Sequence, residues 1–419
     1  MEKLYVYADF DWLKDPELVG QISYEFVRGA QSFSFKFDDK WLVNHSNLSL
    51  SADLNNYPRM QYNINNKGLF GCFTDVLPER WGRTLLKRKE QIVAQEENRQ
   101  VRTLSDFDYL VGVDDFSRLG AFRFKKDKEG AFINTDSNLR VPPVENLSEL
   151  AFACNEIEKT EANHLLPDKK WLMQLIKPGS SLGGARPKAT VVDDSNTLYV
   201  AKFPSRNDDY DVALWEHFCH LLAQKAGINS ALTKTVSLGG NYHTLLSRRF
   251  DRNTLGKRIH FASAMSLLGL SDGDNAQTGH GYLDIVDFIV QECADVENNL
   301  KELYRRVAFN ICVGNSDDHF RNHGFLLTPK GWILSPAYDM NPTVDECQSL
   351  LISRDDNKAD LNILLKAAKD YMLSHDGALK IISSVIDVIK GWKITALKLG
   401  LGKRDMDLFG KVFEERIKL

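Results

Sequence analysis

The feature that most constrains this chain is an ordered run of polar residues around a short hairpin in its C-terminal half. The loop 314–322 reads Gly-Asn-Ser-Asp-Asp-His-Phe-Arg-Asn, and the segment 325–334 after it has the pattern of two short strands around a Pro-Lys-Gly turn. Ala337-Tyr338-Asp339 comes next. The order of loop, hairpin and acid therefore spaces two carboxylates and one amide, those of Asp317, Asp339 and Asn322, around one hairpin.

Protein kinases use this order of residues for phosphoryl transfer. One Asp orients the attacking hydroxyl, while an Asn five residues later and an Asp after the hairpin bind the metal ions. A simpler interpretation is a turn-rich loop after a helix, because Asn and Asp are favoured in turns. The hairpin and the position of Asp339 favour the kinase interpretation.

Two histidines beside these residues leave other interpretations open. His319 completes an Asp-x-His-x-x-Asn order, which occurs in atypical and lipid-type kinases more than in the common protein-kinase form. His319 and His323 are four residues apart, a spacing that can bind zinc on a helix, but no third ligand with comparable spacing follows.

Composition excludes several classes. The 419 residues suffice for two or three domains, and 43% hydrophobic with 26% charged residues is typical of globular proteins. A net charge of −4 gives no global basic field for nucleic acid. No apolar run approaches the roughly 18–20 residues of a membrane span, so we expect no membrane contact. Six scattered cysteines without a CxxC pair indicate reduced residues in a cytoplasm.

The pattern along the chain predicts three segments. Residues 1–145 are β-rich, with a hairpin over 20–37, a helix opened by Pro78, a second hairpin over 120–133 and a linker at 138–146. Residues 146–252 alternate helices, a Gly-rich loop and strands. Residues 253–419 are mainly helical, and the clearest helix, 299–312, leads to the Asp317 loop.

Two charged residues occupy apolar faces in the middle segment. Lys202 shares a strand face with Leu198 and Val200, which favours an anionic partner because burying a bare charge is costly. A lysine that extends from a strand edge into solvent is the alternative. Glu216 lies on the apolar face of a helix predicted over 211–226 and is the natural ion-pair partner of Lys202, unless it is simply solvated.

A glycine-rich loop precedes the Lys202 strand. Residues 177–188 read Lys-Pro-Gly-Ser-Ser-Leu-Gly-Gly-Ala-Arg-Pro-Lys, and glycines let backbone N–H groups approach a phosphate. The loop is neither GxGxxG nor a Walker A motif, and a Gly-Gly turn before a strand is also a common structural device. Its position upstream of Lys202 favours phosphate binding.

Taken together, these segments resemble the HipA family of bacterial toxin kinases, the toxin halves of type II toxin–antitoxin systems. The resemblance is carried by segments 70–83, 181–188, 200–202, 249–252, 314–322 and 337–339, in family order. It implies a bilobal, protein-kinase-like α+β fold with an N-terminal β-rich subdomain. It also implies ATP and Mg²⁺ as cofactors.

The resemblance assigns a role to each matching residue. Asp317 corresponds to the catalytic base, Asn322 and Asp339 to the Mg²⁺ ligands, Lys202 to the phosphate-binding lysine and Arg248 to Phe250 to the adenine hinge. Ser181, or its neighbour Ser180, corresponds to the autophosphorylated serine that silences the kinase. The implied nucleotide-binding residues are Gly183, Gly184, Ala185, Arg186, Pro187, Lys188, Lys202, Arg248, Arg249, Phe250, His319, Phe320, Arg321, Asn322, Tyr338 and Asp339.

The sequence departs from the family pattern at two positions. Arg186 stands where a Gln is more usual in the phosphate loop, and Arg248 where a Glu is commoner at the hinge. Both departures concern nucleotide affinity more than the chemistry.

We therefore expect a Ser/Thr protein kinase. The family implies a translation component, such as an aminoacyl-tRNA synthetase, as substrate, growth arrest as outcome, a helix-turn-helix (HipB-like) antitoxin as partner, and DNA contact only through that antitoxin. A small-molecule or lipid-type kinase is one alternative, and a non-catalytic co-repressor scaffold is another.

Overall fold

The computed structural model describes residues 1–63, 68–135, 141–179 and 184–419 of the chain. Its contacts divide the protein into two compact units, residues 1–208 with 246–262 and residues 209–245 with 263–419. The predicted three-segment division, with boundaries near 145 and 252, is a different partition and stays a prediction. Ser180, Ser181, Gly183 and the first part of the predicted linker lie outside the described residues.

The first unit is built on a five-stranded antiparallel sheet in the order β4-β3-β2-β1-β5. Its strands are β1 (Glu2–Ala8), β2 (Glu17–Val27), β3 (Ala30–Phe37), β4 (Gln61–Tyr62) and β5 (Phe122–Lys125). The predicted hairpin over 20–37 is confirmed as β2 and β3, and Arg28 and Gly29 take the positive φ values that a tight hairpin turn requires. The second predicted hairpin, over 120–133, has only one bridge between its arms, Lys125 with Phe132.

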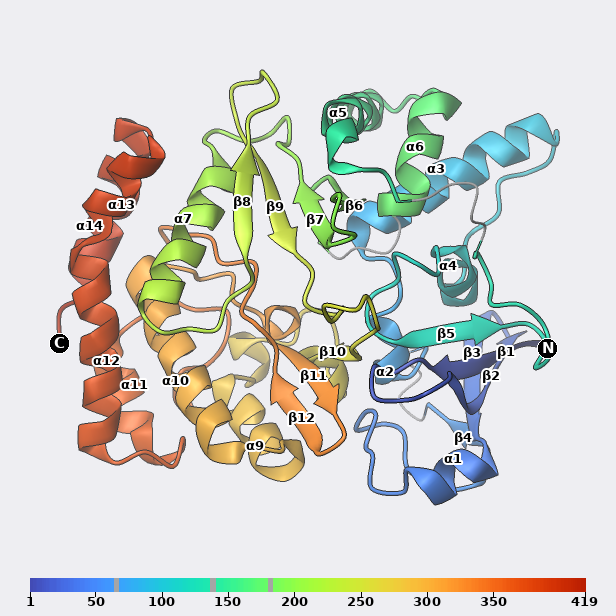
Figure 1. Ribbon diagram of the computed structural model, residues 1–419, viewed down its shortest axis with the longest axis horizontal. Helices are drawn as coiled ribbons and strands as arrows, with labels where there is room; N and C mark the ends of the chain where they lie inside the picture. Colours follow the sequence, from blue (N-terminus) through green and yellow to red (C-terminus); the bar gives the residue numbers. More distant parts are fainter. Residues whose placement is uncertain (64–67, 136–140, 180–183) are drawn as a thin grey trace. The chain divides into compact units, whose positions relative to one another are not determined.

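The helices of the first unit are α1 (Asp39–Asn44), α2 (Gly71–Thr74), α3 (Arg80–Glu96), α4 (Asp106–Gly112), α5 (Leu147–Ala162) and α6 (Lys169–Gly179). The helix predicted after Pro78 is α3, and Trp81, Leu85 and Leu86 are among its buried residues. It packs against α6, which packs against α5 (Figure 1). Strands β6 (Lys188–Val192) and β7 (Leu198–Lys202) follow, and β7 lies between β6 and β9 (Thr244–Arg248).

The segment 246–262 contains a buried ion-pair cluster that is hydrogen-bonded to the rest of the first unit. Asp251 lies 2.6 Å from Arg249 and 2.7 Å from Arg252, and it accepts a 2.9 Å hydrogen bond from the Gly120 amide. Burial alone would raise the pKa of Asp251, but the two guanidinium groups outweigh it and hold the pKa below its usual range. The carboxylate is therefore charged throughout the physiological range.

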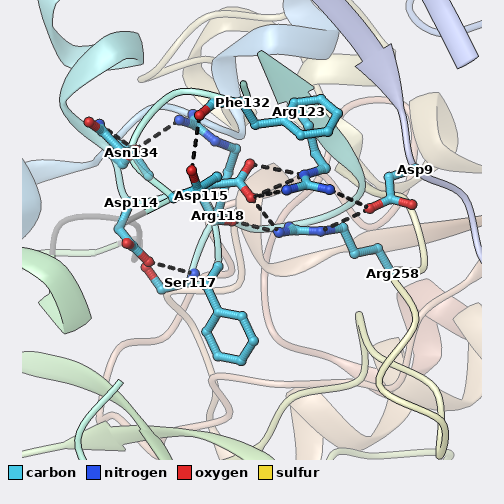
Figure 2. Close-up of polar contacts among 12 residues, drawn as sticks. Asp9, Asp114, Asp115, Ser117, Arg118, Arg123, Phe132, Asn134 and Arg258 are labelled. Carbon is cyan, nitrogen blue, oxygen red and sulfur yellow. Dashed lines mark hydrogen bonds and ion pairs between the residues drawn. The ribbon is translucent and has the colours of Figure 1, made fainter. Parts of the chain in front are cut away.

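A second ion-pair cluster holds the end of the same segment. Figure 2 shows Asp115 between the guanidinium groups of Arg123, at 2.7 Å, and Arg258, at 3.3 Å. Asp9, at the end of β1, lies 3.3 Å from Arg123 and 3.6 Å from Arg258. The sheet and segment 246–262 are thus connected by a cluster of four charges, of which Asp115 and Arg258 are buried.

The second unit is mainly helical, as predicted. It contains α7 (Val212–Lys225), β8 (Thr233–Val236), α8 (Ala264–Leu267), α9 (Tyr282–Glu292), α10 (Val296–Val313), β11 (Gly324–Thr328), β12 (Gly331–Leu334), α11 (Leu361–Lys366), α12 (His375–Lys390), α13 (Trp392–Leu399) and α14 (Lys403–Arg416). The predicted helix over 299–312 is α10, which packs against α9, α11, α12 and α14 (Figure 1).

The predicted hairpin after the Asp317 loop is confirmed as β11 and β12. The unit boundaries fall inside β9 and inside β10 (Phe261–Ser263). No helix among the described residues has both the length and the apolar character that crossing a bilayer requires. Antiparallel sheets beside separate helices make the protein α+β, as expected.

We predict that Asp251→Asn is strongly destabilising. The substitution leaves Arg249 and Arg252, whose side chains are 2% and 8% exposed, as buried cations without full compensation. Breaking a buried ion pair costs about 3–5 kcal/mol. Thermal melting should show a loss of several degrees. Glu96→Gln, which breaks the exposed pair with Lys169, is the control and should change stability by less than about 1 kcal/mol; equal melting temperatures for the two variants would contradict the role of Asp251.

Candidate active site

The Asp317 loop starts where α10 ends. Gly314 takes the left-handed conformation (φ 69°) that stops the helix, and a Cβ at this position would lie 2.7 Å from the Thr343 carbonyl oxygen. The chain then runs through Asn315–His319 into a short 3₁₀ turn, Phe320–Asn322, and on into β11. Helix, loop and hairpin follow in the predicted order.

A buried carboxylate fixes this loop. Asp318 is 3% exposed, and its Oδ2 accepts hydrogen bonds from the Tyr282 hydroxyl (2.7 Å) and the Asn310 amide (2.7 Å), with His323 Nε2 2.9 Å away. Burial alone would raise the pKa of Asp318, but His323 and the hydrogen bonds outweigh it and lower the pKa. No role for Asp318 was predicted from the sequence, because its donors Tyr282 and Asn310 lie on α9 and α10, outside the loop motif.

Asp317, in contrast to the buried Asp318, is exposed to solvent. Partial burial is the largest cause that raises its pKa; His319 lowers the pKa, and the carboxylates of Asp339, Asp318 and Asp345 raise it further. Two neighbouring aspartates therefore have opposite pKa shifts. A raised pKa makes Asp317 the better proton acceptor of the two.

Asn322 and Asp339 carry the side-chain oxygen atoms that the sequence predicts as metal ligands. The Asn322 amide nitrogen donates to the Asp317 carbonyl oxygen at 3.0 Å, which leaves the amide oxygen available as a ligand. Asp339 has a positive φ of 58°, a conformation uncommon outside glycine that is often kept where function requires it. Its carboxylate lies 3.5 Å from the Asn341 amide nitrogen.

An amide oxygen and a carboxylate are ligands that suit a hard cation. Mg²⁺ prefers oxygen ligands and is commonly held by one or two protein groups together with phosphates and waters. Within the described ranges, no group of three or more His, Cys, Asp and Glu side chains is placed to hold a metal ion. His323 is buried against Asp318, and neither His323 nor His319 lies on an α-helix, so the geometry does not favour the zinc alternative.

The remaining residues predicted near this loop are packed around it. Phe320 is buried, and Arg321 lies 3.4 Å from the exposed carboxylate of Asp272. The Tyr338 hydroxyl donates to the Arg321 carbonyl oxygen at 2.5 Å. These contacts connect the 3₁₀ turn to the segment that carries Asp339.

In the first unit, two lysines face one another across a pair of strands. Lys188 on β6 is the direct register partner of Lys202 on β7. Opposite residues of an antiparallel pair project to the same face, and like charges there are unfavourable unless an anion lies near them. This register places the two lysines predicted to bind phosphate on one face of the strand pair, and their role in binding an anion stays a prediction.

The glycine-rich loop is anchored to the start of α3. The Gly184 amide donates to the Glu79 carboxylate, and its carbonyl oxygen accepts from the Trp81 amide at 3.1 Å. The Trp81 indole donates to the Lys188 carbonyl oxygen at 3.0 Å. The segment 70–83 therefore positions the loop, a role that its sequence pattern did not indicate.

Other predicted site residues of the first unit have structural contacts. Arg186 forms an ion pair with Asp208, whose carboxylate also accepts from the Ser205 amide. Arg249 uses its guanidinium for Asp251 and its amide for the Leu198 carbonyl oxygen. An adenine-binding role for Arg248 to Phe250 stays a prediction.

Glu216 lies on α7 and is 2% exposed, with its carboxylate 3.9 Å from His220 Nε2. Burial of an acid on this apolar helix face agrees with the sequence analysis. Lys202 belongs to the first unit and Glu216 to the second. Their ion pair, and the assembly of Lys188 and Lys202 with Asp317, stay predictions.

We predict opposite stability effects for the same substitution at adjacent positions. Asp318→Asn weakens a carboxylate with three polar contacts and should cost about 1.5–3 kcal/mol, seen as a lower melting temperature at pH 7. Asp317→Asn removes a repelled charge and should leave the melting temperature unchanged or slightly raised, by less than about 1 kcal/mol, because solvent screens the exposed group.

Both effects should become smaller as the pH falls. The lowered pKa of Asp318 means that its contribution is present above the ordinary aspartate pKa of about 3.9 and is lost as pH falls through the folded-state value. The destabilisation by Asp318→Asn should therefore shrink toward pH 3. Any stabilisation by Asp317→Asn should also vanish in acid, because the raised pKa lets the native carboxyl protonate first. Equal destabilisation by both substitutions at pH 7 would contradict this account.

Comparison with known proteins identifies the family. Residues 180–392 match the HipA-like C-terminal domain and residues 12–107 the HipA N-terminal domain. The Serine/threonine-protein kinase toxin HipA of Shewanella oneidensis is 27% identical over 198 residues, which is 41% of this chain and 45% of that protein. A putative kinase of Haemophilus influenzae is 26% identical over 209 residues, 43% of this chain and 60% of that protein. The chain spans about half the length of the curated relatives it matches.

A solved structure supports the same fold. HipA of Shewanella oneidensis, in a complex with HipB and operator DNA, superposes with a TM-score of 0.64 at 17% identity, covering 99% of this chain and 95% of that one. The kinase-like α+β fold expected from the sequence is thereby confirmed. The C-terminal domain match covers half of the chain, and the chain belongs to the HipA family.

Proposed function

We propose that this protein is an ATP- and Mg²⁺-dependent serine/threonine kinase that acts as the toxin of a type II toxin–antitoxin system. The observation that carries the proposal is the Asp317 loop, which presents an exposed carboxylate of raised pKa beside Asn322 and Asp339. Membership of the HipA family supports it.

Each residue of the loop has a proposed task. Asp317 accepts the proton of the attacking Ser or Thr hydroxyl, or orients that hydroxyl toward the γ-phosphoryl group. The Asn322 amide oxygen and the Asp339 carboxylate hold Mg²⁺, which when bound neutralises charge on the transferring phosphoryl group. Asp318 takes no part in the reaction and keeps the loop in place.

The first unit supplies the phosphate-binding face. Lys188 and Lys202 carry two positive charges on one side of the β6–β7 pair, which suits the phosphates of ATP. Glu79 and Trp81 hold the backbone of the glycine-rich loop near these lysines, and Arg248 to Phe250 offer main-chain groups to adenine. Glu216 pairs with Lys202 in the active state.

For the regulation and the partners of this protein, we extend the pattern of the HipA family. We propose that Ser181, or Ser180, is autophosphorylated and that the added dianion silences the kinase by repelling the ATP phosphates. A helix-turn-helix antitoxin binds the protein and mediates any contact with DNA. The substrate is a component of translation, with aminoacyl-tRNA synthetases the first candidates.

Residue roles are tested by phosphate transfer from labelled ATP. We expect Asp317→Asn to lower the transfer rate by at least about 10²-fold, because a general base contributes about 10²–10⁴-fold. Asp339→Ala should abolish transfer, and Lys202→Met should raise the KM for ATP. Asp387→Asn, which removes an exposed carboxylate on α12 of the same unit, is the control and should keep full activity. Undiminished turnover in Asp317→Asn would contradict the role of this residue.

A growth experiment separates the kinase from the scaffold alternative. Wild-type protein should arrest growth on induction without its antitoxin, whereas Asp317→Asn at the same expression level should be harmless. Equal arrest by both would favour a non-catalytic scaffold. Phosphate appearing on a metabolite or lipid, with none on protein Ser or Thr, would favour the small-molecule kinase.

A further inference from the structure

A pocket of about 420 Å³ opens beside Asp317, entirely within the second unit. Its walls come from the 3₁₀ turn around Ala276, the Asp317 loop and the segment after Asp339. The volume lies within the about 300–1,000 Å³ of typical ligand sites. We call it the Gln348 pocket, and its polar lining includes Asn275, Gln277, Ser316, Asp317, Asp345 and Gln348.

The walls are held by hydrogen bonds between the three segments. The Ala276 amide donates to the Ser349 carbonyl oxygen at 2.8 Å, and the Ser349 amide donates to the Ser316 carbonyl oxygen at 2.9 Å. Gln348 is fixed through its own backbone, because its amide donates to the Asn357 carbonyl oxygen at 2.7 Å and its carbonyl accepts from the Asn357 side chain at 2.6 Å. Hydrogen bonds within the protein therefore fix the walls of the pocket.

The side chain of Gln348 has no such contacts. It is 1% exposed, and among the residues that the structure describes neither its amide oxygen nor its amide nitrogen has a hydrogen-bond partner. Leaving a buried polar group unpaired costs about 1–3 kcal/mol, and native proteins rarely keep one without a reason. One donor and one acceptor side by side match the C=O and N–H groups of a polypeptide main chain.

The charges around the pocket select among ligands. Asp317 and Asp345 line it, and none of the described lysines, arginines or histidines does. The Asp345 carboxylate accepts a 2.8 Å hydrogen bond from the Ser316 hydroxyl, and its main-chain carbonyl oxygen accepts one from the Arg416 guanidinium. An anionic ligand such as a nucleotide is disfavoured beside two carboxylates, whereas a basic polypeptide is favoured.

We propose that the Gln348 pocket binds the segment of the protein substrate that carries the acceptor hydroxyl, with the Gln348 amide pairing to its main chain and Asp345 selecting a Lys or Arg near the acceptor. This inference rests on the proposed kinase function and extends it to substrate recognition. Gln348 acts as a binding residue, and the acceptor Ser or Thr enters the pocket on the side of Asp317.

The first test measures transfer to a positional-scanning library of Ser/Thr peptides, with the full-length protein and ATP. The wild type should prefer Lys or Arg at one or more flanking positions, and Asp345→Asn should lose that preference. Gln348→Leu should raise the KM for the preferred peptide about ten-fold, the effect expected from one or two hydrogen bonds, without changing the KM for ATP. Gln174→Leu, at another glutamine with an unpaired buried oxygen but in the first unit, is the matched control and should change neither KM.

The second test reports binding without catalysis. Cys347 lines the pocket and is exposed, whereas Cys72, Cys154, Cys219 and Cys312 are buried. The preferred basic peptide should slow alkylation of Cys347 by N-ethylmaleimide, located by mass spectrometry. The same peptide with Glu in place of Lys and Arg should not slow it, and Gln348→Leu should weaken the protection by the basic peptide about ten-fold.

The outcomes separate the two proposals. Protection of Cys347 without any phosphate transfer would support the pocket and count against the kinase. Transfer with an unchanged peptide KM in Gln348→Leu, or a preference for acidic flanking residues, would overturn the pocket proposal and leave the kinase standing. A lower melting temperature for Gln348→Leu with unchanged peptide binding would likewise overturn it and give Gln348 a purely structural role.

Discussion

The geometry of the Asp317 loop depends on the buried carboxylate of Asp318. Its Oδ2 atom gathers contacts from α9, α10 and His323, and so fixes the end of α10 relative to the start of the hairpin. A charged group in such a position is stable only because its hydrogen-bond acceptors are used. With Asp318 turned inward, the adjacent Asp317 turns outward, and the chain presents one structural and one exposed carboxylate in succession.

A comparable division of labour exists in the first unit. Lys188 and Lys202 are register partners on one face of the β6–β7 pair, while Glu79 and Trp81 bond to Gly184 and Lys188 at the described end of the glycine-rich loop. Segment 246–262 is fixed to the same unit by the hydrogen bond between the Gly120 amide and Asp251 and by the ion pair between Arg258 and Asp115. In both units, groups proposed to act on ATP are thus supported by hydrogen bonds and ion pairs of neighbouring side chains.

Local patterns in the sequence predicted much of this arrangement. Alternation and a Gly turn located the β2–β3 hairpin, a 3.6-residue apolar stripe located α10, and the fixed spacing of Asp317, Asn322 and Asp339 located the loop. Lys202 was identified as a candidate site residue because a charged side chain on an apolar strand face is unusual.

The supporting residues were missed because their partners are distant in sequence. Asp318 bonds to Tyr282, Glu79 to Gly184 and Asp251 to Gly120, and no local pattern indicates such pairs. Gln348 has no side-chain partner at all, so only its burial and its place in a pocket mark it. The second hairpin was overestimated because alternation over 120–133 does not show how many residues pair.

Intact-mass spectrometry tests the central claim most directly. Wild-type protein and Asp317→Asn would be compared before and after incubation with ATP and Mg²⁺, starting from material free of phosphate. The account predicts a gain of one phosphate in the wild type alone, located on Ser181 or Ser180. An equal gain in Asp317→Asn, or no gain in either protein, would contradict it.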